Sequence, residues 1–297
     1  MSIISATRRG FLYQDRFAVA KYLEQLQGKN LKQFYIDYPV MTRKSLDILH
    51  VDISDRTIIY EVKSGEEFKK DKRKKESSEV RDAFVNLKEY GDTVSGCRMN
   101  IVIRKGFQNS ITSYWDKIEY IKARPFTDRI VKQCTGWLFD KLNLPGINNH
   151  EDLHSFCQRI SLTDFADDEI VSGDLYPDID DFVLQKINDF TRQFGADICT
   201  FEYPSEILMN KLYHTCRLHA GMGTDLHLIF QKIIKDFLVH RKLLDCGYPA
   251  PAGRDRLRDE LSQEIDQEFS QFLNEPTLAT SQDQLTGLTE GDIIQNI

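Results

Sequence analysis

The sequence predicts an α/β domain at the amino-terminal end, followed by a region built from helices alone. Over about the first 120 residues, apolar runs with strand character alternate with amphipathic helical patterns. Strand signals nearly vanish after Pro125. The clearest helical pattern beyond that point starts at Asp225 and carries a broad apolar stripe, which is typical of a helix packed in a core.

The predicted order of elements in the first half is α-β-β-β-α-β-α. Three helices are expected from apolar residues at helical spacing, over residues 10–26, 76–92 and 110–123. Gly91 is expected to stop the second of these helices. Four strands are expected where β-branched and aromatic residues cluster, over residues 33–40, 45–51, 56–63 and 97–106.

The second half is expected to be helical. Helices are predicted near residues 127–142, 149–160, 178–194, 205–219, 225–245 and 254–273. We therefore expect a first domain over 1–125 and a helical domain over 126–275 that serves in regulation, partner docking or oligomerisation. Residues 276–297 form a polar tail that could order against a partner.

Composition excludes several classes of protein. The chain has no apolar run of the ~20 residues that span a membrane, and its first residues lack the pattern of a signal peptide. The six cysteines are scattered without a CxxC pair, which indicates reduced thiols and a cytoplasmic location.

Charge is divided unevenly along the chain. Residues 1–125 contain 24 Lys and Arg against 17 Asp and Glu, whereas residues 126–297 contain 15 against 29. Phosphate backbones are attracted to the first part and repelled by the second. The alternative is chance clustering of charges on solvated surfaces.

The stretch "SLDILHVDISDRTIIYEVKSG" carries charges where an apolar strand ends. Folding it about a turn centred near Ser54 places Asp47 opposite Glu61, with Lys63 on the same face. Two carboxylates so close repel each other unless a cation lies between them, and Mg²⁺ suits such a site. Lys63 could then orient a water for phosphodiester hydrolysis. The alternative is a surface hairpin with a cross-strand Glu–Lys pair.

The hairpin resembles the motif of the restriction-endonuclease-like PD-(D/E)xK superfamily, in which an Asp precedes Glu-x-Lys on the next strand. Asp47, Glu61 and Lys63 match this order, while Leu46 stands in place of the Pro that names the motif. The resemblance covers roughly residues 8–110. It implies a restriction-endonuclease-like mixed-sheet core, followed by an all-α C-terminal domain.

A second match lies in the first helix. The double-stranded-DNA endonuclease domain of CD-NTase-associated antiphage effectors opens with a similar Gly-x-x-Tyr-Gln signature, and Gly10, Tyr13 and Gln14 match it here. The same domain continues to a sequence similar to "EVKSG", which ends here at Gly65. The resemblance implies that Gln14 reaches the site from the first helix.

The resemblance also implies a ligand set. Asp47, Glu61 and the backbone carbonyl of Val62 would bind Mg²⁺, for which Mn²⁺ can substitute. Lys63 would assist the nucleophile, and Gln14 would complete the catalytic set. The substrate would be double-stranded DNA.

A basic stretch follows the hairpin directly. Its six basic residues could bind the DNA backbone beside the site. These residues are Lys69, Lys70, Lys72, Arg73, Lys74 and Lys75. The alternative is a solvated, mobile loop.

Two further segments are candidates for a functional role. Residues 161–185 hold eight acidic residues and no Lys or Arg. They could dock a basic partner, cover the nuclease groove, or form a solvated loop. "HEDLH", from His150 to His154, spells the HExxH pattern of zinc proteases, but its acidic residues and the preceding Asn149 are typical of a helix start.

These observations favour a metal-dependent DNA endonuclease, the effector of a prokaryotic antiphage or anti-plasmid system. The helical part resembles in role the variable region that, in Lamassu-type nuclease subunits, docks on an SMC-like ATPase. Control by a partner complex or by homo-oligomerisation is therefore expected through residues 126–297. The alternative is a catalytically silent, nuclease-like subunit that binds DNA or acts as a scaffold.

Overall fold

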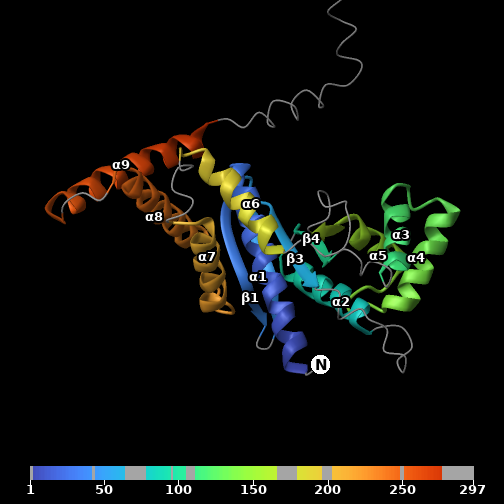
Figure 1. The fold of residues 1–297 in the computed structure, drawn as a ribbon. Coiled ribbons are helices and arrows are strands. Elements are labelled where there is room, and N and C mark those ends of the chain that lie inside the picture. Colours follow the sequence, from blue (N-terminus) through green and yellow to red (C-terminus); the bar gives the residue numbers. More distant parts are fainter. Residues whose placement is uncertain are drawn as a thin grey trace, which may run out of the picture.

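The computed structural model of the chain describes residues 3–41, 44–63, 78–94, 96–104, 111–165, 179–195, 203–247 and 251–275. Within these ranges the chain forms one five-stranded open sheet and nine α-helices (Figure 1). The fold is mixed α/β, and most of its helices follow the fourth strand in the sequence. The basic stretch from Lys69 to Lys75 lies outside the described residues.

The strands lie in the sheet in the order in which they occur in the chain. The antiparallel part holds β1, β2 and β3, and β4 and β5 then add in parallel to β3. The bounds of the strands are Leu31–Met41, Lys44–Asp52, Thr57–Lys63, Arg98–Arg104 and Ile160–Phe165. The first four occupy the places that the sequence predicts.

The fifth strand corrects the expectation of an all-α second half. β5 is six residues long and follows helix α5 (His150–Gln158) after a single residue, Arg159. Its sequence "ISLTDF" alternates apolar and polar residues without an apolar run, so the helical pattern before it dominates the local signal. Parallel pairing with β4, as of Leu162 with Ile101, stabilises it as a strand at the edge of the sheet.

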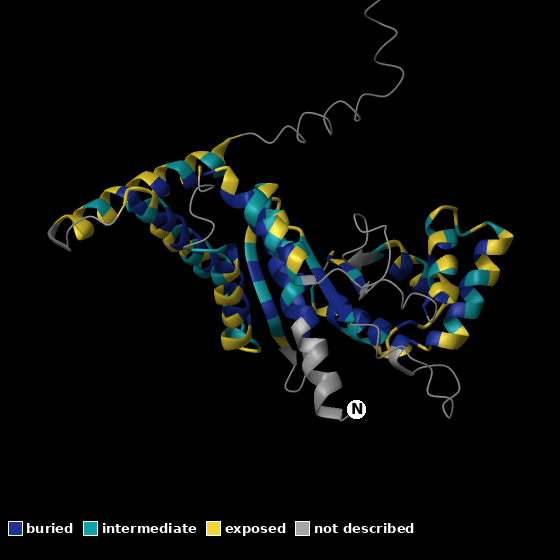
Figure 2. Cartoon of the chain, viewed as in Figure 1, coloured by how far each residue is buried: buried dark blue, intermediate teal, exposed yellow. Residues whose placement is uncertain are grey.

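Five helices share one hydrophobic core on one face of the sheet. α1 lies against α6 and α7 and against the sheet, and α8 packs on α9 and β1 (Figure 1). Buried residues are concentrated on the strands and on the helix faces toward them, whereas α9 is largely exposed (Figure 2). The bounds are Ile3–Gln27 for α1, Ile179–Arg192 for α6, Ser205–His219 for α7, His227–Asp245 for α8 and Pro251–Asn274 for α9. α1 therefore begins before the predicted start at Gly10.

The remaining helices form a second core on the other face. α2 packs on β3 and β4, and α3, α4 and α5 pack on one another beyond it. Strand side chains alternate between the two cores: Tyr60 and Val62 face the α1 core, while Ile59 faces the α2 core. The bounds are Ser78–Thr93 for α2, Thr112–Lys122 for α3, Arg129–Leu142 for α4 and His150–Gln158 for α5.

Gly91 does not stop α2, which continues to Thr93. A Cβ at Gly91 would come 2.8 Å from Sδ of Met99, a fully buried residue of β4. Gly91 therefore serves close approach of the helix to the sheet and not helix termination.

The start of α8 is fixed to the edge of the sheet. Leu226 donates a backbone hydrogen bond to the carbonyl of Phe34 at 2.7 Å, and the carboxylate of Asp225 accepts the Phe34 N–H at 3.0 Å. These contacts satisfy backbone groups of β1, which is an edge strand. The apolar stripe predicted beyond Asp225 is core, because Phe230, Ile234 and the other inward residues are buried.

Two further expectations concern membrane-spanning helices and the cysteines. No helix in the described part is long and apolar enough to cross a membrane. The five described cysteines, namely Cys97, Cys134, Cys157, Cys216 and Cys246, carry free thiols.

Candidate active site

The β2–β3 hairpin sets two carboxylates opposite each other. Leu49 pairs with Ile59 and Ile48 with Tyr60 in antiparallel register. One residue further along, the same register places Asp47 opposite Glu61, as the sequence predicts. Both side chains lie on the face of the sheet that α2 covers, since each is two residues from a residue of that core.

Asp47 is anchored to the neighbouring strand. Its Oδ2 accepts a hydrogen bond of 2.7 Å from the backbone N–H of Val62. Burial, followed by the negative charge of Glu61, raises the pKa of Asp47 well above its usual range, although Lys63 and the Val62 N–H act in the opposite direction. The two carboxylates are therefore close enough to repel each other, and a cation between them would relieve that repulsion.

Glu61 lies deeper, with 2% of its surface exposed. Its Oε1 is 2.6 Å from Nζ of Lys63 and accepts a hydrogen bond of 3.0 Å from Nδ2 of Asn86 on α2. Lys63 is two residues along the same strand, so the ion pair lies on one face and does not cross between strands. Buried carboxylates need such partners, because an unpaired buried charge is costly.

Gln14 reaches this region from α1. Its Nε2 donates to Oδ1 of Asp37 at 2.8 Å and to the backbone carbonyl of Asp47 at 3.2 Å. The side chain is 6% exposed, so these contacts hold it in a defined orientation. The structure thus brings Gln14, Asp47, Glu61 and Lys63 together, and the Val62 N–H takes part as an anchor.

Sequence reasoning missed three residues of this site. Asp37 lies inside β1 with a φ of 44°, a conformation that costs energy for a residue other than glycine. Burial raises the pKa of its carboxyl group. Asn86 and Tyr90 reach the site from α2; burial and then the charges of Glu61 and Asp47 raise the pKa of Tyr90. The isolated charge in the apolar run "QFYIDYPV" is a signal that could have found Asp37.

The negative charges continue onto α1. Burial, with a smaller contribution from the charge of Asp37, raises the pKa of Asp15 to about 6, although the hydrogen bond and the charge of Arg217 act in the opposite direction. Nε of Arg217, on α7, lies 2.8 Å from Oδ2 of Asp15. Asp15, Asp37, Asp47 and Glu61 therefore form a chain of interacting carboxyl groups across α1, β1, β2 and β3.

The donor set of the hairpin fits a hard cation. Oδ2 of Asp47 and Oε1 of Glu61 are used in the contacts above, and the other oxygen of each accepts no hydrogen bond from a residue that the structure describes. Within the described ranges, no group of three or more His, Cys, Asp or Glu side chains is arranged to hold a metal ion. A metal here would thus take two carboxylates and complete its shell with backbone oxygen and water, which is how Mg²⁺ is commonly bound.

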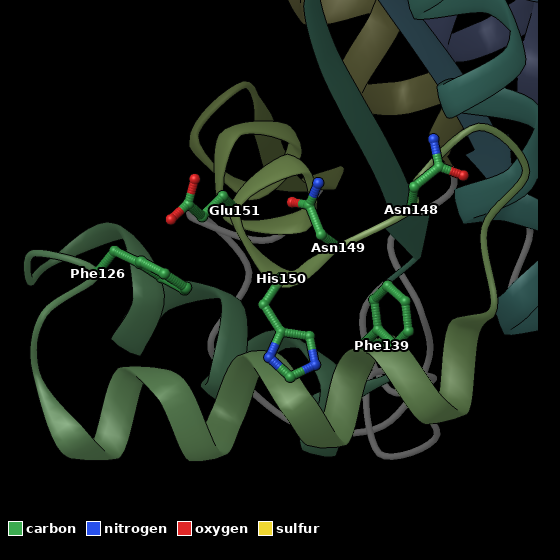
Figure 3. A pocket seen from close by; sticks show the side chains of 6 residues that line it. All are labelled: Phe126, Phe139, Asn148, Asn149, His150 and Glu151. Atoms are coloured by element: carbon green, nitrogen blue, oxygen red, sulfur yellow. The ribbon is translucent and has the colours of Figure 1, made fainter.

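The HExxH pattern forms a helix start. Asn149 caps α5 by accepting the N–H of Asp152 at 2.9 Å, and His150 is the first helical residue. The ring of His150 lies edge-on to Phe139 with centroids 5.0 Å apart, beside a cavity of about 570 Å³ (Figure 3). His154 packs instead on Phe126, at 5.4 Å. Each histidine has its own aromatic partner, which is the arrangement of a packed helix end.

Comparison of the chain with models of protein families, with curated proteins and with solved structures finds no match. The fold and the site define the chain as an α/β protein with a buried carboxylate–lysine cluster on a β-hairpin. Its function is therefore inferred from the geometry of that cluster.

Proposed function

We propose that the chain is a metal-dependent endonuclease with a restriction-endonuclease-like core, and that it hydrolyses phosphodiester bonds of double-stranded DNA. The observation that carries the proposal is the placement of Asp47 opposite Glu61, with Lys63 on the same face. Paired carboxylates beside a lysine are suited to phosphodiester hydrolysis, which needs a bound metal and stabilisation of developing negative charge.

Each side chain has a role that follows from its position. Asp47 and Glu61, with the Val62 carbonyl, would hold Mg²⁺ or Mn²⁺, and that ion when bound polarises the phosphate and acidifies a water. Lys63 would exchange its contact with Glu61 for one with the attacking water and the phosphate oxygens. Water adds to phosphorus as one ester P–O bond breaks, and the leaving oxygen takes up a proton. Gln14 would hold Asp47 through its backbone carbonyl.

DNA would be held next to this site by the basic stretch from Lys69 to Lys75, because it follows Lys63 closely in the chain. Such contacts neutralise phosphates without reading the sequence of the DNA.

We further propose that the helical part controls the enzyme as the effector of a cytoplasmic prokaryotic defence system, through a partner complex or homo-oligomerisation. The two residues that follow Gln14 in the sequence, Asp15 and Arg16, form ion pairs that join α1 to this part. Arg16 binds Asp180 of α6 through two contacts of 2.6 Å, from Nε to Oδ1 and from Nη2 to Oδ2. Asp15 pairs with Arg217 of α7. A partner that moves α6 or α7 would therefore act on the helix that carries Gln14.

The test is cleavage of supercoiled plasmid DNA in Mg²⁺ by the wild type, Lys63→Ala and Glu61→Gln. Lys32→Ala is the matched control, because Lys32 is an exposed lysine of β1 that pairs with Asp55 at the hairpin turn. Cleavage by the wild type and the control alone is the expected result. Equal cleavage by all four proteins would remove the site from the hairpin. If none cleaves DNA and Mn²⁺ does not bind, the chain is a silent DNA-binding or scaffolding subunit.

A further inference from the structure

A pocket with charged lining residues lies between α8 and α9. A pocket of about 370 Å³ is lined by His240 of α8 and by Arg254 and Arg258 of α9. Two carboxylates, Asp236 and Asp255, also line it. Two buried apolar residues, Val239 and Leu243, complete the lining. A volume of this size is within the range of small-molecule sites.

The two arginines are unpaired although the helix around them is acidic. Arg254 and Arg258 are four residues apart, so they lie on one face of α9 and repel each other. Neither forms an ion pair or a hydrogen bond with a residue that the structure describes. Arg256, on the same helix, instead pairs with Glu260 at 2.9 Å. An anion in the pocket would offset the repulsion between the two guanidinium groups.

A third cation, Lys211 of α7, acts on His240 without lining the pocket. Nζ of Lys211 contacts the hydroxyl of Tyr203 at 3.1 Å, and the ring of Tyr203 lies 4.4 Å from that of His240. Burial lowers the pKa of His240, and the charges of Lys211, Arg254 and Arg258 lower it further. The cations that act on His240 therefore come from α7 and α9, while Asp236 and Asp255 line the same pocket.

We propose that this pocket binds a small phosphate-bearing ligand. Guanidinium groups donate pairs of hydrogen bonds that match phosphate oxygens, and here two of them line one pocket on the same face of α9. Residues 126–297 have an excess of 14 acidic residues, so two arginines without a carboxylate partner are a local exception to their surroundings. Those surroundings repel a long polyanion such as DNA, which favours a small ligand over a nucleic-acid backbone.

The experiment is calorimetric titration of the full chain with inorganic pyrophosphate at constant ionic strength. The wild type is compared with Arg254→Gln/Arg258→Gln, and Arg256→Gln is the control because its guanidinium already pairs with Glu260. We expect saturable binding by the wild type and the control, and binding weaker by about tenfold for each pocket arginine removed. Lys211→Gln, a single change outside α9, should also weaken binding. This variant keeps the test valid if the double variant does not fold.

The titration of His240, followed by NMR, gives an independent readout. Bound pyrophosphate should raise the pKa of His240 in the wild type, because the anion offsets the three cations. The proposal is overturned if pyrophosphate does not bind or if it binds the double variant as tightly as the wild type. It is also overturned if these arginines are needed for the binding of a short DNA duplex but not for the binding of pyrophosphate. Binding is measured without DNA cleavage, so the outcome is independent of the activity proposed for the hairpin.

Discussion

Asp15 of α1 and Arg217 of α7 form an ion pair 2.8 Å long, one residue along the chain from Gln14. Asp15 is 6% exposed, whereas the Arg217 side chain is half exposed. The pair therefore offsets only part of the cost of burying the Asp15 charge, and the pKa of Asp15 lies at about 6. A contact between the helical part and the helix of the site thus depends on pH.

The first prediction concerns stability against pH. The pKa of Asp15 rises from 3.8 to about 6 on folding, so the folded chain binds the extra proton between these values. Stability from this group is therefore present at low pH and falls by about 3 kcal/mol as pH rises through that window. Asp15→Asn should remove this fall. Urea unfolding at about pH 4.5, 5.5 and 7.5 measures the free energy of unfolding of both proteins.

Asp189→Asn is the matched control, because Asp189 is an exposed carboxylate of α6 that pairs with Arg192. It should retain the dependence on pH. Arg217→Met should extend the fall to higher pH, since Arg217 lowers the pKa of Asp15. An identical pH profile for the wild type and Asp15→Asn would contradict the account.

Local patterns predicted most of the fold. The strand β3 and the helix α8 have strong periodicity and β-branched or apolar residues where their cores need them, so tertiary contacts agree with local preference. β5 could not be predicted, because its six residues are stabilised by pairing with β4 across a long separation in the chain. Gly91 was misjudged because the reason for a glycine there lies in Met99, which is close only in the folded chain.

The candidate site also contains residues that could be predicted from the sequence and residues that could not. Asp47 and Glu61 could be paired from sequence, because a hairpin register follows from the position of its turn. Asn86 could not, since its contact with Glu61 depends on how α2 rotates and packs on β3. Asp37 is brought to Gln14 by a left-handed backbone conformation, which no local preference of aspartate requires.

The second prediction is metal binding at the hairpin. Mn²⁺ should raise the melting temperature of the wild type, and Asp47→Ala should abolish the rise. The rise should shrink as pH is lowered, because protonation of Asp47 competes with the metal and its pKa is raised. Thermal melts at about pH 8, 7 and 6, with and without Mn²⁺, measure both effects. Asp266→Ala, an exposed carboxylate of α9, should leave them unchanged.

The third prediction separates Asn86 from the metal ligands. Asn86→Ala removes the hydrogen bond to Oε1 of Glu61 but leaves both carboxylates in place. Partners of metal ligands affect metal affinity by about 10- to 100-fold, so Mn²⁺ binding should weaken without being lost. Titration followed by electron paramagnetic resonance measures the affinity. Affinity equal to that of the wild type would show that Asn86 does not position Glu61, and Asn86→Asp should not restore it, because it adds a negative charge.

The fourth prediction tests the contact between α2 and the sheet. Alanine favours a helix over glycine by about 1 kcal/mol, so Gly→Ala inside a helix stabilises the protein unless the new methyl group clashes. At Gly136 of α4 the nearest atom to a new Cβ is Cε1 of His150 at 3.7 Å, an ordinary contact. At Gly91 the nearest atom is Sδ of Met99 at 2.8 Å, and overpacking of this kind costs about 1–3 kcal/mol. Gly136→Ala should therefore raise the free energy of unfolding and Gly91→Ala should lower it. A rise for both would mean that Met99 moves aside freely, and that α2 is held less tightly against β4 than its burial indicates.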